Sequence, residues 1–103
     1  MAESARELFE GLEEGVDPAR TRGTTASYRF DVEGVGSWHV DVNDGDVDVT
    51  KTGAPADCVI RASEENLLRV VRGDLNPVTA YMTGRVKVEG DITLAKRLRD
   101  LFG

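Results

Sequence analysis

The sequence predicts an α+β domain in which helices cover one face of a five-stranded, mainly antiparallel sheet. Two observations support this prediction. Between Tyr28 and Thr50, apolar and polar residues alternate in three successive runs, as in strands that bury one face and expose the other. Helical periodicity precedes this block and returns after a fourth strand-like run at residues 58–60. The resulting order, α-β-β-β-β-α-α-β-α, is typical of the α+β class.

The first predicted helix begins at Ser4 and ends near Gly15. Ser4 and Glu7 have the spacing of a capping box, in which each residue satisfies a free backbone N–H of the first turn. Apolar residues then recur at helical spacing on one face: Leu8, Phe9 and Leu12. A connecting loop follows to about Ala26, so residues 1–25 form a helix and a linker ahead of the sheet.

Three strands follow, joined by two tight turns. Their inward-facing residues are apolar: Tyr28, Phe30, Val32, Trp38, Val40, Val42, Val47 and Val49. Gly34-Val35-Gly36 separates the first run from the second, and Asp44-Gly45 separates the second from the third. Asp-Gly is a strong hairpin signal because both central residues of that turn need a positive φ. The runs therefore predict an antiparallel meander with one face in water.

A fourth strand begins at Cys58-Val59-Ile60, and a helix follows it. Ser63 is its predicted N-cap and Gly73 its predicted end. The apolar residues of this helix are Leu67, Leu68, Val70 and Val71. Cys58 is the only cysteine, so an internal disulfide is excluded, and its apolar neighbours predict a buried thiol.

The last third of the chain predicts a short helix, a fifth strand and a final helix. Asn76 caps the short helix, with Pro77 at its first position, and Gly84 ends it. Residues 85–89 alternate as a strand, and Asp91 caps the final helix. The apolar face of the short helix is Val78, Tyr81 and Met82. The apolar face of the final helix is Leu94, Ala95, Leu98, Leu101 and Phe102.

Composition and charge exclude several classes of function. The 103 residues suffice for one domain, and a net charge of −6 argues against a nucleic-acid partner, which needs clustered Lys and Arg. No apolar run approaches the ~20 residues of a membrane span. Residues 1–4 lack the basic and apolar regions of a secretory signal, so we expect a cytoplasmic protein.

No motif in the sequence predicts catalysis, a metal or a cofactor. Gly34-Val35-Gly36 leads into another strand and lacks the third glycine of a dinucleotide-binding loop. A calcium loop centred on Gly45 would place Val40 at its first position and Lys51 at its twelfth, where acids are required. His39, the only histidine, falls on the polar face of its strand. We therefore predict a protein that is not an enzyme and has no cofactor.

Four segments of the sequence together resemble the sterol carrier protein-2 family of nonspecific lipid-transfer domains. The most specific is residues 73–91, which combine the helix stop, short capped helix, strand and helix start described above. The others are residues 28–45, 56–68 and 94–101. On this resemblance residues 1–103 are a single domain whose family core is residues 26–103, and the N-terminal helix fits by position.

The resemblance implies a curved sheet and an apolar tunnel, between sheet and helices, that holds a fatty acid, acyl-CoA, phospholipid or sterol-like molecule. Carried onto this sequence, the tunnel lining is Phe30, Trp38, Val40, Ile60, Leu67, Val71, Val78, Tyr81, Met82, Leu94, Leu98 and Phe102. Each of these residues could equally be ordinary core. Periodicity shows which face is buried, and it does not show whether a cavity lies beneath that face.

Basic residues near the C-terminus suggest a partner. They are Arg85, Lys87, Lys96, Arg97 and Arg99. These cations are either a solvated surface or a weak contact with anionic membranes.

Two functions remain open. The first is a non-catalytic lipid-binding or lipid-transfer domain. The alternative is an interaction or dimerisation module with the same fold and no ligand cavity. The sequence is compatible with a monomer or a homodimer.

Overall fold

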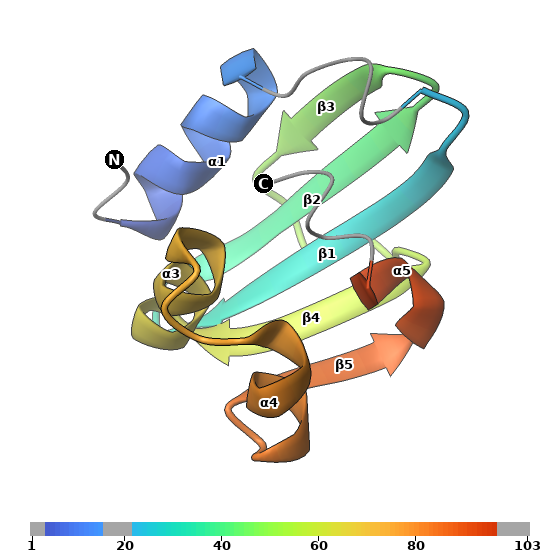
Figure 1. Cartoon of the computed structure of the whole chain (residues 1–103). Coiled ribbons are helices and arrows are strands. Elements are labelled where there is room, and N and C mark those ends of the chain that lie inside the picture. The colour runs from blue at the N-terminus through green and yellow to red at the C-terminus, as the bar shows by residue number, and fades with distance from the viewer. Residues whose placement is uncertain (1–3, 16–21, 97–103) are drawn as a thin grey trace.

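The computed structural model describes residues 4–15 and 22–96 and contains the predicted elements in the predicted order (Figure 1). The helices are α1 (Ala5–Gly15), α3 (Glu64–Arg72), α4 (Pro77–Met82) and α5 (Ile92–Lys96). The strands are β1 (Thr25–Glu33), β2 (Gly36–Asn43), β3 (Asp46–Thr50), β4 (Cys58–Ser63) and β5 (Val86–Gly90). The predicted α+β class is therefore confirmed. The predicted residues 98, 101 and 102 of the final helix lie outside the described part.

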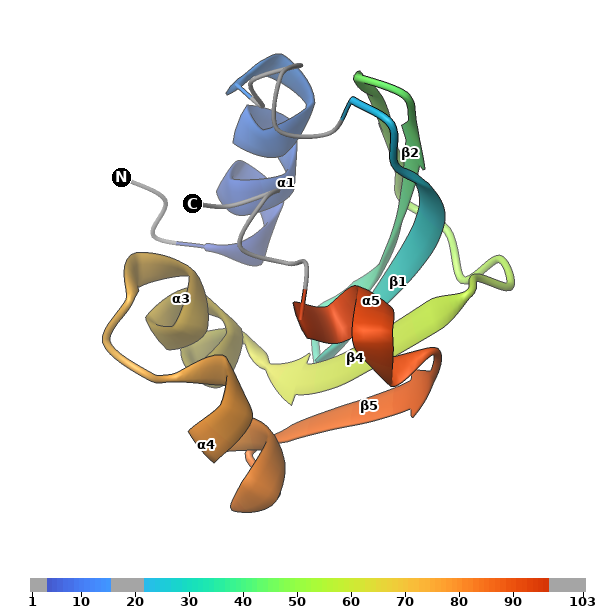
Figure 2. The same cartoon turned by 45° about the vertical axis from the view of Figure 1, so that its right-hand side comes forward.

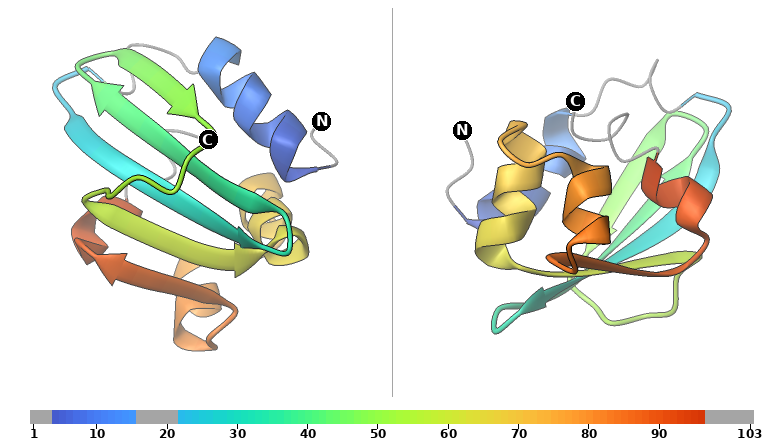
Figure 3. Two further views of the ribbon diagram at one scale, coloured as in Figure 1. Left: turned by 180° about the vertical axis from the view of Figure 1, so that it is seen from behind. Right: turned by 60° about the horizontal axis from the view of Figure 1, so that its bottom comes forward.

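The five strands form one sheet in the order β3-β2-β1-β4-β5. The pairs β1–β2, β2–β3 and β4–β5 are antiparallel, which confirms the predicted meander, whereas β1 and β4 are parallel. The sheet is therefore mixed, because residues 51–57 carry the chain from the β3 edge back to a place beside β1 (Figure 3). That connection lies over the outer face of the sheet, where Arg29 Nη1 donates a hydrogen bond to the Gly53 carbonyl (3.3 Å).

The predicted turn and cap residues have the backbone angles and hydrogen bonds that these positions need. Asp44 (φ 44°) and Gly45 (φ 96°) form the β2–β3 turn, and Asp44 is the one non-glycine residue with positive φ in the described part of the chain. Ser63 Oγ accepts from the Asn66 N–H (3.2 Å) at the start of α3. Gly73 ends that helix in the left-handed conformation, with φ at 85°. The predicted helix boundaries at Ser63 and Gly73 are thus confirmed.

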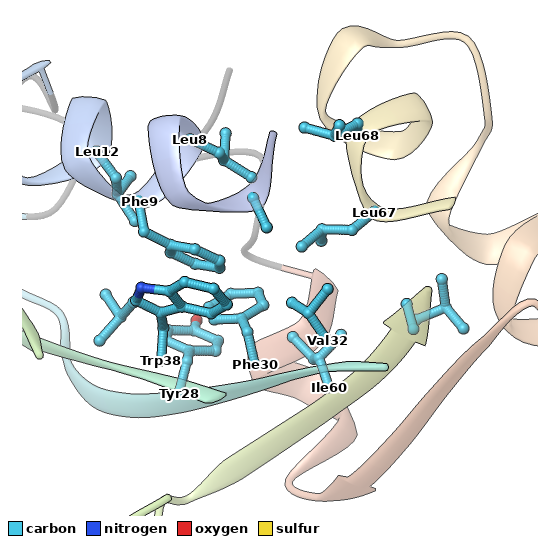
Figure 4. Packing of buried hydrophobic residues seen from close by; sticks show 14 of the residues in the cluster. Leu8, Phe9, Leu12, Tyr28, Phe30, Val32, Trp38, Ile60, Leu67 and Leu68 are labelled. Atoms are coloured by element: carbon cyan, nitrogen blue, oxygen red, sulfur yellow. The ribbon is translucent and has the colours of Figure 1, made fainter. Parts of the chain in front are cut away.

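The four helices of the described residues lie on the concave face of the curved sheet (Figure 2). Inward side chains of β1, β2 and β4 are buried beneath them: Ala26, Tyr28, Phe30, Val32, Trp38, Val40, Val42, Cys58, Ile60 and Ala62. At the α1 end, Phe9 stacks on Trp38 with ring centroids 4.8 Å apart and packs against Phe30 at 5.1 Å (Figure 4). This end of the interior is filled by aromatic rings.

Candidate functional site

An apolar groove of about 300 Å³ lies at the other end of the concave face, between β4–β5 and the helices that cover them. Its lining comes from β4, α3, α4, β5 and α5, and every lining side chain is apolar or aromatic: Ile60, Leu67, Val70, Pro77, Val78, Tyr81, Met82, Val86, Val88 and Ile92. The volume is at the lower end of the range seen for small-molecule sites. The chemistry of the lining suits a hydrocarbon ligand.

The floor of the groove is the sheet itself. Ile60 pairs with Val88, and the next inward pair is Ala62 with Val86. Ile60 and Val86 are buried, and Leu67 of α3 is buried beside them (Figure 4 labels Ile60 and Leu67). Because these side chains stand on hydrogen-bonded strands, the floor has a fixed shape.

The rim of the groove is helix α4, which is capped by Asn76 and contacts the interior through Ala80. Asn76 Oδ1 accepts from the Val78 N–H (2.9 Å) and the Thr79 N–H (3.3 Å), which confirms the predicted cap. Only Ala80 of this helix is buried. The predicted apolar residues of α4 do share one face of the helix. That face borders the groove and is largely exposed to solvent.

The large apolar side chains of the rim are unusually exposed. The exposed fractions are 79% for Met82, 59% for Val78, 46% for Ile92 and 43% for Tyr81. In the part of the chain that the structure describes, Val35 is the only other large apolar side chain of this exposure. Exposed apolar side chains that gather around one hollow mark a binding surface more often than isolated ones do.

Helix α5 closes the groove on the side of the β5 C-terminus. Asp91 Oδ1 accepts from the Thr93 N–H (3.0 Å), so the predicted cap is confirmed. The hydroxyl of the buried Tyr28 donates to the Leu94 carbonyl (2.9 Å) and ties α5 to the sheet. This tie holds the first residue of α5, Ile92, over the floor of the groove.

The predicted lining residues divide into three groups. The groove contains Ile60, Leu67, Val78, Tyr81 and Met82. The packed core contains Phe30, Trp38 and Val40, and partly buried Val71 and Leu94 pack against that core. Leu98 and Phe102 lie outside the described residues.

Five groove residues were absent from the predicted lining: Val70, Pro77, Val86, Val88 and Ile92. A signal existed for three of them. Val86 and Val88 occupy alternate positions of a predicted strand. Val70 lies three residues after Leu67 and so shares its helical face. The positions of Pro77 and Ile92, at the starts of two short helices, depend on how those helices pack.

Of the predicted basic patch, Arg85 and Lys87 are exposed and belong to the segment that forms the groove wall. Lys96 is the last described residue of α5. Arg97 and Arg99 lie outside the described residues.

The nucleophile and base candidates lie away from the groove. His39 is partly exposed on the outer face of β2. Cys58 is buried and free, and burial, with a smaller effect of the Asp91 and Asp57 carboxylates, raises the pKa of its thiol to about 11. Residues 4–15 and 22–96 contain no cluster of His, Cys, Asp and Glu that could hold a metal ion.

None of the described helices is long and apolar enough to cross a membrane.

Comparison with known proteins decides the family. The SCP-2 sterol transfer family matches residues 6–103, which include α1 except its first residue, the sheet and the described lining of the groove. The chain belongs to this family. Members of the SCP-2 sterol transfer family bind and transfer lipids generally, so an apolar groove is the feature that the family leads us to expect.

Relatives of the chain range from small domains to much longer proteins. It is 29% identical to hydroxysteroid dehydrogenase-like protein 2 of Xenopus laevis over 106 residues, which cover 99% of the chain and 25% of that relative. The chain thus spans about a quarter of the length of the dehydrogenase-like relatives it matches. SCP-2 domains therefore occur as parts of longer proteins that carry an enzyme's name.

Two solved SCP-2 structures share the fold. The sterol carrier protein domain 2 of Helicoverpa armigera is 28% identical, with a TM-score of 0.76 over 92% of this chain and 82% of that one. Palmitated SCP2L2 of Aedes aegypti is 22% identical, with a TM-score of 0.71 over 96% of this chain and 94% of that one. Both likenesses extend over nearly the whole domain.

Proposed function

We propose that this domain binds a lipid of the fatty acid, acyl-CoA or sterol type in the groove between β5, α3 and α4, and transfers it without chemical change. One observation supports this most directly. Val78, Tyr81, Met82 and Ile92 surround one hollow lined by apolar and aromatic side chains, and they remain exposed to solvent. A hydrocarbon chain placed there would remove both its own surface and the rim's surface from water.

The burial of such a ligand's hydrocarbon chain would release enough free energy to support binding. Burial of a methylene contributes about 0.8 kcal/mol, so a sixteen-carbon chain contributes about 13 kcal/mol before the costs of association. These contacts have no preferred direction, because the described lining residues offer no charged side chain and only the Tyr81 hydroxyl as a polar group. We therefore expect selection by apolar bulk and length, and weak discrimination among head groups.

A role in binding also fits the absence of converging catalytic groups around the groove. General acid–base catalysis needs a titratable side chain within hydrogen-bond reach of the reacting atom. In the described part of the chain the lining contains no carboxylate, imidazole, amine or thiol. The palmitated state of the Aedes aegypti protein, which shares this fold, supports an acyl chain as one ligand class.

The test is a pair of substitutions on neighbouring strands. Val88 points into the groove, while Val59 lies on the outer face of β4, opposite Glu89. Val88→Trp should fill the groove and lower the uptake of a fluorescent fatty acid at least tenfold. Val59→Trp adds the same ring to the solvated face and should leave uptake unchanged. Equal uptake by wild type and a folded Val88→Trp variant would overturn the proposed site.

Native mass spectrometry separates this proposal from the alternative interaction module. A monomer that retains lipid mass after gentle purification, or gains one equivalent of added fatty acid, supports a carrier. A ligand-free dimer that takes up no lipid supports the interaction module and contradicts the carrier.

A further inference from the structure

We propose that the outer rim of the groove, defined as residues 75–88, is a docking surface for an anionic lipid bilayer. In the docked state Met82 and Val78 of α4 enter the apolar layer, and Arg85 and Lys87 contact anionic head groups. The inference rests on the proposed function, since it names the membrane partner of the same site.

The first argument is the position and exposure of the rim. Helix α4 stands at the edge of the sheet farthest from α1 and projects beyond β5 (Figures 1 and 3). Met82 is the most exposed large apolar side chain of the described residues, and Val78 is one helical turn away from it. A ligand inside the groove would cover the inward parts of these side chains, but it would leave their tips in water.

The second argument is the distribution of charge. From Leu75 to Val88 the sequence contains no Asp or Glu, and this is its longest stretch without a carboxylate. The same stretch contains Arg85 and Lys87, both exposed. Lys87 lies on the outer face of the edge strand β5, opposite Arg61, and Glu89 is the next residue on that face. The chain as a whole has a net charge of −6, so most of its surface would be repelled by an anionic bilayer. The rim therefore combines exposed apolar side chains with a sequence free of carboxylates, so it can approach such a bilayer with its apolar side chains foremost.

The charge pattern also disfavours a second copy of the chain as the occupant. A two-fold symmetric contact through the rim would bring the same patch of both copies together. Arg85 and Lys87 of each copy would then meet at one interface without any carboxylate from residues 75–88 to pair with them. A bilayer supplies the negative charges that a second copy lacks here.

Site-specific labelling tests insertion directly. Because Cys58 is buried and its thiol is protonated at neutral pH, a maleimide fluorophore should react selectively with a new exposed cysteine. Met82→Cys and Val35→Cys provide matched positions, since Val35 is the exposed apolar side chain of the β1–β2 turn. With vesicles of phosphatidylcholine and phosphatidylserine, we expect a blue shift and an intensity gain for the label at position 82 and no change at position 35. Equal responses at both positions, or none at either, would overturn the docking surface.

Binding to vesicles tests the charge argument. Met82→Glu and Val35→Glu change the net charge equally, and only Met82→Glu should reduce co-sedimentation with anionic vesicles. Arg85→Ala and Lys87→Ala should each lower the partition coefficient about fivefold, the effect expected for one cation at an anionic surface. Arg22→Ala removes a cation outside the rim and serves as the control. Association should collapse at high salt, and binding that is indifferent to salt and to anionic lipid would contradict the proposal.

The docking surface and the lipid site fail in distinguishable ways. Uptake of a fatty acid from a cyclodextrin complex involves no bilayer. Normal uptake without vesicle binding would overturn the docking surface and leave the lipid site intact. Vesicle binding without uptake would keep the docking surface and refute the lipid site. A dimer that dissociates on the Met82→Glu substitution would assign the rim to self-association and overturn the bilayer proposal.

Discussion

The two ends of the concave face differ although the strands beneath them follow the same pattern. Under α1, the ring of Phe9 contacts those of Trp38 and Phe30, and these three side chains are buried. Under α4, the inward residues Ile60 and Val88 form the floor of an open groove. We refer to these regions as the closed end and the open end.

The difference comes from the helices and not from the sheet. Helix α1 has 11 residues and inserts Phe9, whose ring packs on Trp38 and Phe30. The hollow that remains beside this ring has mixed walls, lined by Arg6, Phe9, Glu10, Trp38, Val49 and Lys51. Helix α4 has 6 residues and buries only Ala80, so it approaches the sheet without filling the space beside it. The two ends thus differ in the size of the side chain that the covering helix buries, Phe9 in α1 and Ala80 in α4.

The largest expected effect of a substitution is at the closed end. Phe9→Ala removes the ring that contacts both Trp38 and Phe30 and should lower the free energy of unfolding by about 3–5 kcal/mol. Urea denaturation measures this loss. Val78→Ala at the open end is the control and should change stability by less than about 0.5 kcal/mol. A loss below about 1 kcal/mol for Phe9→Ala would mean that the closed end is not the tightly packed half.

The second effect is a pH dependence from Cys58, which lies beside Tyr28 in the parallel β1–β4 pair. Its thiol has a pKa raised from 9.0 to about 11 in the folded protein. The folded chain therefore keeps this proton, while the unfolded chain loses it above pH 9. The contribution to stability is complete below pH 9 and should fall by about 2–3 kcal/mol as the pH rises to 11.

The contribution of Cys58 is isolated by comparison with Cys58→Ala, because other groups also titrate above pH 9. The difference in unfolding free energy between the two proteins should vary with pH only in this window. A pH-independent difference would show that solvent reaches the Cys58 thiol in the folded protein.

A smaller effect is expected where the two ends meet. Tyr28→Phe removes the hydrogen bond to the Leu94 carbonyl while the ring keeps its packing, and should cost about 0.5–1.5 kcal/mol. Hydrogen exchange should accelerate in α5 more than in α1. If exchange in α5 is unchanged, this hydrogen bond does not hold the helix against the sheet.

The smallest effect on stability is expected at the open end. Met82→Ser replaces the most exposed rim side chain and should alter the melting temperature little, because Met82 is already largely in water. Fatty acid uptake should nevertheless weaken severalfold, since the ligand loses one apolar wall. A large loss of stability would show that Met82 supports the fold, and the contrast between the two ends would then be less sharp.

Much of the fold could be predicted from local signals. The turn at Asp44-Gly45 and the caps at Ser63 and Asn76 depend on residues that are close in sequence, so their chemistry is readable without a structure. Strand alternation likewise identified the inward residues of β1 and β2. The pairing of β4 with β1 was not readable in this way, because residues 51–57 place the two strands side by side through a crossing that no local pattern describes.

The candidate site was predictable only in part, as the predicted lining shows. The family resemblance assigned Ile60 and Leu67 to the lining together with Phe30 and Trp38, and periodicity placed all four on buried faces. The first pair lines the groove and the second pair lies in packed core. Periodicity depends on the direction in which a side chain points from its own element. Whether space remains above that side chain depends on which helix covers it and how large its residues are.

By itself, then, the sequence determined the α+β fold class, the order of the elements and the apolar face of each one. These follow from backbone stereochemistry and spacing along the chain. Only the tertiary structure decided that α1 packs Phe9 onto its half of the face and that α4 leaves an apolar groove in the other half. Packing is the reason: a void is a property of several elements together, and no single segment encodes it.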